Sequence, residues 1–236
     1  MFIDVALNPA EIARLPGCDL SETTCVVFDV LRATSSMVTA LAHGVEAVYP
    51  VSTIPEALAL QSRLPGSVLA GERHGERIDG FELGNSPFEY GSAVCGKTLV
   101  TTTTNGTGAL RACEGARVVL VGALLNLGAL AQELRNRNPA RVLLVCAGTF
   151  EEFALEDAYA AGLLVEALGD AQLSDAAHSV KALPRLFSDP LSALQTAKNG
   201  RVLVGKGRGK EVERCAQVSF YSAVGRMESG VVRPIF

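Results

Sequence analysis

Short apolar runs alternate with segments of helical spacing through most of this sequence, and no other feature constrains the fold as strongly. The apolar runs are rich in β-branched residues and end at turn residues, which is typical of buried strands. They are residues 24–28, 47–51, 68–70, 98–102, 118–121 and 142–146. The segments with helical spacing are residues 35–42, 54–63, 108–113, 127–136 and 155–168.

Alternation of strands and helices predicts a three-layer α/β/α fold with a mostly parallel sheet covered on both faces. We expect residues 1–236 to form a single unit. The alternative is two α/β lobes, residues 1–95 and 96–236, with the active site in the cleft between them. After residue 174 the pattern becomes mainly helical, at 183–187, 190–198 and 210–216, with one short predicted strand at 201–204.

Composition places the chain in the cytoplasm and excludes two classes of partner. The first residues carry no basic stretch followed by an apolar core, and the six cysteines are scattered without a paired C-x-x-C motif. A net charge of −4 with no basic run argues against nucleic acid and against an anionic membrane as partners. An anionic ligand would therefore need local arginines or a metal. Nothing in the sequence decides whether the chain forms a homo-oligomer.

Ligands bind at the carboxyl ends of the strands in parallel α/β sheets, where loops lead into helix N-termini. The predicted strand at residues 24–28 is followed by Asp29, Arg32, Thr34, Ser35 and Ser36. An acid, an arginine and hydroxyls at a helix start suit a metal, a phosphate or both. An ordinary helix cap beside an Asp29–Arg32 pair would look similar.

The longest irregular segment, residues 71–92, also follows a predicted strand. It is rich in glycine and charge, and it includes Glu72, Arg73, Arg77, Asp79 and Asn85. Glycine lets backbone amides approach a ligand closely, and loops this long in compact domains are usually functional. The alternative is a solvated surface loop.

The segment Thr103, Thr104, Asn105, Gly106 and Thr107 lies between a predicted strand and a predicted helix. Hydroxyls, an Asn-Gly turn and a helix N-terminus resemble an anion-binding cradle. A plain helix cap by Asn105 or Thr107 would give the same pattern.

A fourth strand end leads through Glu151 and Glu152 to Glu156 and Asp157 at a helix start. Carboxylate oxygens are good magnesium ligands, so these acids are candidate metal ligands. The helix dipole alone also favours acids in a first turn.

Several established phosphatase and nucleotide-binding motifs are absent from the sequence. Leu31 occupies the position where a second aspartate would follow a nucleophilic Asp29, and no cysteine is followed by arginine after five residues. The patterns G-x-x-x-x-G-K-[ST], G-x-S-x-G and H-E-x-x-H are also missing, and the three histidines are too few for a histidine-rich metal centre.

The segments 29–36, 71–87 and 102–107, with Cys146-Ala147-Gly148 and Leu155-Glu156-Asp157, resemble the 2-phosphosulfolactate phosphatase family in order and spacing. Weaker similarity continues through residues 199–201 and 215–217, so the resemblance covers essentially the whole chain. It implies magnesium-dependent hydrolysis of (2R)-2-phospho-3-sulfolactate to 3-sulfolactate and phosphate, in the pathway to coenzyme M.

Our working hypothesis assigns roles within this reaction. Asp29 would bind Mg²⁺ together with one or more of Glu72, Glu156 and Asp157. Arg32 and Arg73 would clamp phosphate, with Arg32 also catalytic, and Arg77 would bind a carboxylate or sulfonate. The remaining predicted binding residues are Ser35, Ser36, Asn85, Thr103, Thr104, Asn105, Gly106 and Thr107.

Asp29 or Asp79 would then activate water or attack the phosphoryl group directly, and the sequence leaves both routes open. Three other functions also remain: a phosphatase for another small phospho-carboxylic acid, a protein that binds a phosphorylated metabolite without turnover, and a magnesium-dependent lyase or transferase.

Overall fold

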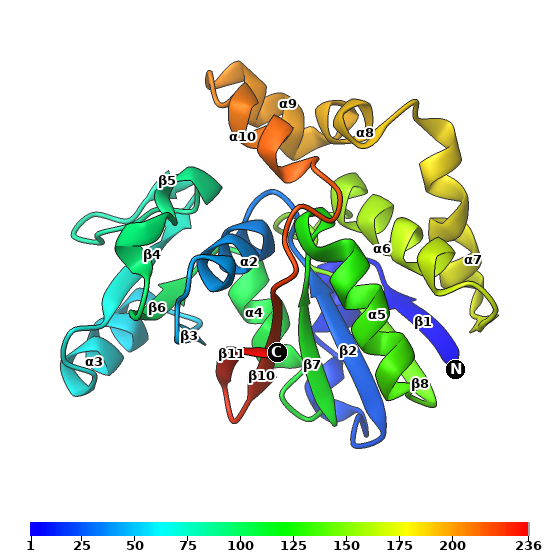
Figure 1. The fold of residues 1–236 in the computed structure, drawn as a ribbon, viewed down its shortest axis with the longest axis horizontal. Coiled ribbons are helices and arrows are strands. Elements are labelled where there is room, and N and C mark those ends of the chain that lie inside the picture. The colour runs from blue at the N-terminus through cyan, green and yellow to red at the C-terminus, as the bar shows by residue number, and fades with distance from the viewer. Residues whose placement is uncertain (236) are drawn as a thin grey trace.

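The computed structural model describes residues 1–235 and contains the predicted alternation of strands and helices. Figure 1 shows a central sheet with helices packed on both faces, so the predicted three-layer α/β/α fold is confirmed. The strands are β1 (Phe2–Ala6), β2 (Thr23–Phe28), β3 (Ala47–Pro50), β4 (Val68–Arg73), β5 (Glu76–Arg77), β6 (Thr98–Thr102), β7 (Val118–Gly122), β8 (Arg141–Cys146), β9 (Gln172–Leu173), β10 (Val224–Glu228) and β11 (Val231–Ile235). The helices are α1 (Pro9–Ile12), α2 (Ala33–Ala42), α3 (Ile54–Arg63), α4 (Gly106–Ala112), α5 (Leu127–Arg137), α6 (Leu155–Leu168), α7 (Asp175–Ala182), α8 (Pro190–Thr196), α9 (Lys198–Gly205) and α10 (Gly209–Cys215).

The sheet has the strand order β5-β4-β6-β3-β11-β10-β7-β2-β8-β1-β9. Strands β4, β6 and β3 are parallel to one another, and so are β7, β2, β8, β1 and β9. The hairpin β10–β11 lies between these groups and is antiparallel to β7 on one side and to β3 on the other. The two parallel groups therefore run in opposite directions where the hairpin joins them.

Strand β2 shows how the sheet is covered, because its side chains alternate between two cores. Val26 and Phe28 pack in a cluster with residues of α5 and α6, whereas Cys25 and Val27 pack in a second cluster with residues of α2 and α4. All six β2 residues are buried, as the uninterrupted apolar run predicts for a strand covered on both faces. A smaller third cluster packs α3 against β4 and β6.

The C-terminal hairpin was not predicted, although Ser229-Gly230 offers a two-residue turn signal. Both turn residues have positive φ, 49° for Ser229 and 74° for Gly230, as a type I′ turn requires. The flanking strands contain arginine, glutamate and proline, so their apolar pattern is weak. The division into two lobes near residue 95 stays a prediction. Strand β6, which follows that boundary, lies between β3 and β4.

The predicted strand at residues 201–204 is wrong, because this segment belongs to helix α9. The run Val202-Leu203-Val204 has the composition of a strand. Packing of α9 on α8 decides against it: Gly200 lies directly against the carbonyl oxygen of Leu194, and Leu203 is buried. Helices α8, α9 and α10 form one cap, which Figure 1 shows above the sheet, next to the loop that follows β2.

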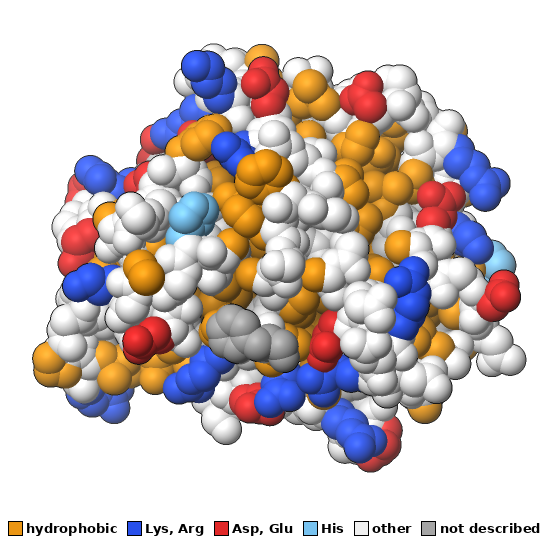
Figure 2. Space-filling view, viewed as in Figure 1, with side chains coloured by type: hydrophobic (Ala, Val, Ile, Leu, Met, Phe, Trp, Pro, Cys, Tyr) orange, Lys and Arg blue, Asp and Glu red, His pale blue; other side chains and the backbone are white. Residues whose placement is uncertain are grey.

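Figure 2 shows apolar side chains gathered on one face between this cap and the helices below it, with charged side chains around the margin. Within residues 1–235 none of the helices has the length and apolar character needed to cross a membrane.

Candidate active site

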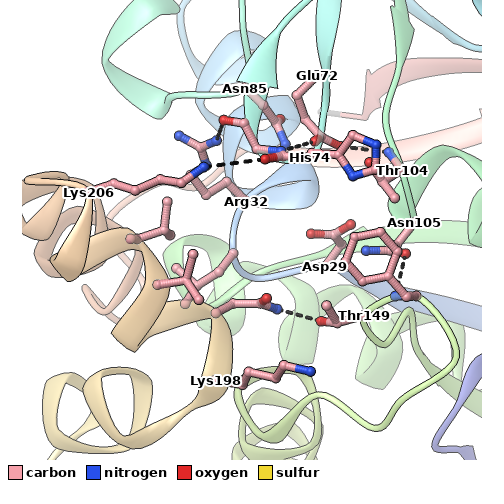
Figure 3. A pocket seen from close by; sticks show the side chains of 16 residues that line it. Asp29, Arg32, Glu72, His74, Asn85, Thr104, Asn105, Thr149, Lys198 and Lys206 are labelled. Carbon is pink, nitrogen blue, oxygen red and sulfur yellow. Dashed lines mark hydrogen bonds between the residues drawn. The ribbon is translucent and has the colours of Figure 1, made fainter.

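A cavity of about 310 Å³ lies between the strand-end loops and the cap. Loops after β2, β4, β6 and β8 form one side of it, and one face of α9 forms the other (Figure 3). Its lining residues are Asp29, Leu31, Arg32, Glu72, His74, Gly75, Asn85, Thr104, Asn105, Thr149, Phe150, Lys198, Asn199, Val202, Leu203 and Lys206. The structure therefore brings together Asp29, Arg32, Glu72, Asn85, Thr104 and Asn105 from the predicted set.

Asp29 directly follows β2, and its carboxylate caps the start of α2 by accepting a hydrogen bond from the N–H of Ala33 at 3.0 Å. Burial raises the pKa of Asp29 to about 7, and the nearby carboxylates of Glu72 and Glu156 add to this rise. The N–H groups of Ala33 and Gly106 oppose it. A pKa near neutral suits a group that is used for proton transfer.

Glu72 lies at the end of β4 and holds two loops together. Its Oε1 accepts a hydrogen bond from the N–H of Thr104 at 2.6 Å, and its Oε2 accepts one from the N–H of Gly75 at 2.7 Å. The side chain is buried, so these two donors compensate for the loss of water around its charge.

The predicted backbone cradle at residues 103–107 is largely used for internal contacts. The N–H of Thr104 binds Glu72, and Thr103 and Thr107 exchange hydrogen bonds between N–H and hydroxyl at 3.1 Å in both directions. Gly106 packs against Asp29, with space for no side chain. The buried hydroxyl of Thr104, by contrast, has no partner within the described part of the chain and is free to donate to a ligand.

Arg32 is a buried cation at the junction of the loops and the cap. It forms an ion pair with Glu211 of α10 and donates a hydrogen bond to the carbonyl oxygen of Gly75 at 2.9 Å. Figure 3 shows its guanidinium higher than the Asp29 carboxylate and clearly to the left of it. A buried guanidinium beside a cavity is well suited to binding phosphate.

Glu156 and Asp157, the acids at the start of α6, have different surroundings. Both oxygens of Asp157 bind backbone, accepting from the N–H of Val30 at 2.8 Å and from that of Gly148 at 3.1 Å. Glu156 accepts from the Asn199 amide at 2.6 Å through Oε1, while its Oε2 is buried without a partner among residues 1–235. Burial raises the pKa of both carboxyl groups.

Ser35 and Ser36 lie behind the cavity wall. The hydroxyl of Ser35 donates to the carbonyl oxygen of Val30 at 2.7 Å, and that of Ser36 donates to the carbonyl oxygen of Asn85 at 2.8 Å. These serines fix the loops that carry the lining residues.

Arg73, Arg77 and Asp79 do not line the cavity. The Arg73 guanidinium turns back onto its own loop, donating to the carbonyl oxygen of Glu72 at 2.7 Å and to the Thr102 hydroxyl at 2.8 Å. Arg77 and Asp79 are exposed. The hairpin formed by β4 and β5 directs these side chains away from Asp29, so the structure does not place them where their predicted roles require.

Several lining residues were missed by sequence reasoning: His74, Thr149, Phe150, Lys198, Asn199 and Lys206. The rings of His74 and Phe150 stack across the cavity edge, 5.9 Å apart. Lys198, Asn199 and Lys206 come from the cap and lie on one face of α9, a signal that was hidden because a strand was predicted between them at residues 201–204.

The carboxylates of the cavity fit a divalent cation that is held partly by the protein and partly by a bound phosphate and water. Asp29 and Glu72 offer carboxylates, and the unpartnered Glu156 Oε2 adds negative charge nearby. Residues 1–235 contain no preformed group of three His, Cys, Asp or Glu side chains around one ion position. Mg²⁺ commonly needs only one or two carboxylates, since substrate phosphate and water complete its shell.

Comparison with known proteins agrees with the resemblance seen in the sequence. A model of the family described as 2-phosphosulpholactate phosphatase matches residues 11–230. The chain is 37% identical to a probable 2-phosphosulfolactate phosphatase of Carboxydothermus hydrogenoformans, over 98% of this chain and 95% of the relative. It is 42% identical to one of Deinococcus radiodurans, over 82% and 83%, and 36% identical to one of Clostridium acetobutylicum, over 98% and 100%.

Proposed function

Because the chain belongs to the 2-phosphosulfolactate phosphatase family, a family of phosphoric monoester hydrolases, we propose that it hydrolyses 2-phosphosulfolactate to 3-sulfolactate and inorganic phosphate with a magnesium ion. The observation that carries the proposal is the cavity whose lining includes Asp29, with its pKa of about 7, together with buried Arg32 and Glu72. A cation, two acids and an unpartnered hydroxyl meet there.

Asp29 and Glu72 are the residues that would hold the magnesium ion, with Glu156 behind them. When bound, the ion would neutralise charge on the phosphoryl oxygens. Asp157 is not assigned to the metal, because it does not line the cavity and its two oxygens bind the loops after β2 and β8 instead.

The chain's own groups supply orientation and proton transfer. Arg32 binds the phosphoryl oxygens through its guanidinium, and the Thr104 hydroxyl donates to them. Asp29 accepts the proton of an attacking water or attacks phosphorus itself. The stereochemistry at phosphorus separates the two. With a phosphoryl group made chiral by oxygen isotopes, direct attack by Asp29 followed by water gives two displacements and retention of configuration, whereas one attack by water gives inversion.

We further propose that the reaction serves coenzyme M biosynthesis, as the family resemblance implies, and that it takes place in the cytoplasm, as the composition indicates. The substrate carries a phosphate, a carboxylate and a sulfonate. A negatively charged chain binds such a molecule only through a local group of cations and a metal.

Phosphate release tests the proposal, measured with 2-phosphosulfolactate, phospholactate and phosphoglycolate in the presence and absence of magnesium. We expect release that requires magnesium, is fastest with 2-phosphosulfolactate and is lost in Asp29→Asn. Preference for another phospho-acid would reassign the substrate. Tight binding without any release would identify a metabolite-binding protein, and a phosphorus-containing product other than inorganic phosphate would indicate a lyase or transferase.

A further inference from the structure

One face of α9 forms the cap side of the cavity. The lining residues Lys198, Val202 and Lys206 follow one another at intervals of four, so they form a single row along the helix. The backbone positions of the two lysines are separated by roughly 12 Å along the helix axis. A flexible four-carbon side chain at each end of this row lets both ammonium groups turn toward the centre of the cavity.

The proposed substrate needs cations beyond the phosphate site. Its carboxylate and sulfonate remain once Arg32 binds the phosphate. Arg77, which the sequence suggested for this purpose, lies outside the cavity. Within the described chain, the lysine and arginine side chains that line the cavity are Arg32, Lys198 and Lys206.

Both lysines pair with exposed glutamates across the mouth of the cavity. Lys198 Nζ lies 2.5 Å from Glu152 in the loop after β8, and Lys206 Nζ lies 2.9 Å from Glu76 of β5. The glutamate side chains are 62% and 57% exposed, so losing a lysine leaves them solvated. Without Lys206, Glu76 would still pair with the Arg208 guanidinium, which lies 2.6 Å from its carboxylate. Exposed pairs of this kind contribute little to stability and exchange partners readily.

We propose that Lys198 and Lys206 determine substrate specificity by exchanging Glu152 and Glu76 for the carboxylate and sulfonate of the substrate. This inference rests on the proposed function. The two lysines bind the end of the molecule that does not react, while Asp29, Arg32 and Glu72 act on the phosphate. An ordinary phosphomonoester without these acidic groups leaves both glutamate pairs intact.

Binding of the product 3-sulfolactate tests the inference without turnover. Calorimetry would compare wild type with Lys198→Gln, Lys206→Gln and the control Lys210→Gln, using 3-sulfolactate, lactate and 2-hydroxyethanesulfonate. Lys210 is an exposed lysine of α10 that does not line the cavity. We expect each cavity variant to weaken 3-sulfolactate binding roughly tenfold or more. The lysine that binds the sulfonate should affect 2-hydroxyethanesulfonate and not lactate.

Unchanged 3-sulfolactate binding in Lys198→Gln and Lys206→Gln, or an equal loss in Lys210→Gln, overturns the inference, as does failure of the wild type to bind 3-sulfolactate. Phosphate release by the wild type is measured in parallel. If the wild type releases phosphate but the variants bind 3-sulfolactate as tightly as the wild type does, the proposed function is supported and the role of the lysines is rejected. If 3-sulfolactate binding depends on the lysines but the wild type releases no phosphate, the role of the lysines is supported and the proposed function is rejected.

Discussion

The carboxylate of Asp157, in the first turn of α6, accepts a hydrogen bond at 2.8 Å from the backbone N–H of Val30, 127 positions earlier in the chain. Its other oxygen accepts from the N–H of Gly148 at 3.1 Å. One side chain thus joins the loop after β2 to the loop after β8. Asp29 directly precedes Val30, so Asp157 positions the proposed catalytic aspartate from outside the cavity.

Asp157→Asn should destabilise the protein by about 1–3 kcal/mol, because one buried N–H would lose its acceptor. Activity should fall as well, since the loop that carries Asp29 loses an anchor. Urea denaturation followed by circular dichroism measures the first effect. Glu156→Gln is a matched control: it keeps an oxygen for Asn199 and removes a buried charge, so its stability without metal should equal or exceed that of wild type. Wild-type stability in Asp157→Asn would contradict the anchoring role.

Asp29 should make the metal-free protein less stable as pH rises. Its pKa is raised from 3.8 to about 7 in the folded state, so folded protein holds a proton that unfolded protein releases between these values. The free energy of unfolding therefore falls over this interval, by about 1.4 kcal/mol per pH unit and on the order of 4 kcal/mol in all.

Comparison with Asp29→Asn isolates this contribution from that of other buried acids. The two proteins should be similarly stable near pH 4, and the variant should be the more stable above pH 7. Denaturation in the presence of a metal chelator at a series of pH values measures the difference. A difference that does not change with pH would show that Asp29 stays ionised.

Gly106 and Gly108, two residues apart in α4, should respond oppositely to alanine. A Cβ on Gly106 would lie 2.6 Å from Asp29 Oδ2 and 2.7 Å from Ala33 Cβ, whereas a Cβ on Gly108 meets nothing within 4 Å among the described residues. Gly106→Ala should therefore lower both stability and phosphate release. Gly108→Ala should raise the free energy of unfolding by about 0.5–1 kcal/mol, through helix propensity, with activity unchanged. Equal effects at the two positions would argue against close packing of α4 on Asp29.

Arg32 and Arg77 should differ sharply in their contributions to turnover. Arg32 is buried in the cavity wall and Arg77 is exposed outside it. We expect Arg32→Gln to reduce kcat/KM at least about a hundredfold, as the loss of a charged contact to the transferred phosphoryl group would. Arg77→Gln and Asp79→Asn should stay within about twofold of wild type. Steady-state phosphate release decides, and a large loss at Arg77 or Asp79 would mean that their loop rearranges when substrate binds.

The sequence by itself determined the order of most strands and helices and the segments that form the site. Buried strands are rich in apolar and β-branched residues, and β2, β6 and β8 have this composition. Polar residues that follow such strands, as Asp29 and Thr104 do, stand out from the pattern of the core.

The tertiary structure decided which side chains meet. A local sequence pattern could not show that Asp157 accepts a hydrogen bond from the N–H of Val30. Nor could it show that Arg77 is exposed to solvent while Glu72 lines the cavity. It also could not show that Gly200 packs on α8 and makes residues 198–205 a helix. Helix and strand place different residues on one face. Val202 and Leu203 both line the cavity, which a helix allows, whereas a strand would point two successive residues to opposite faces.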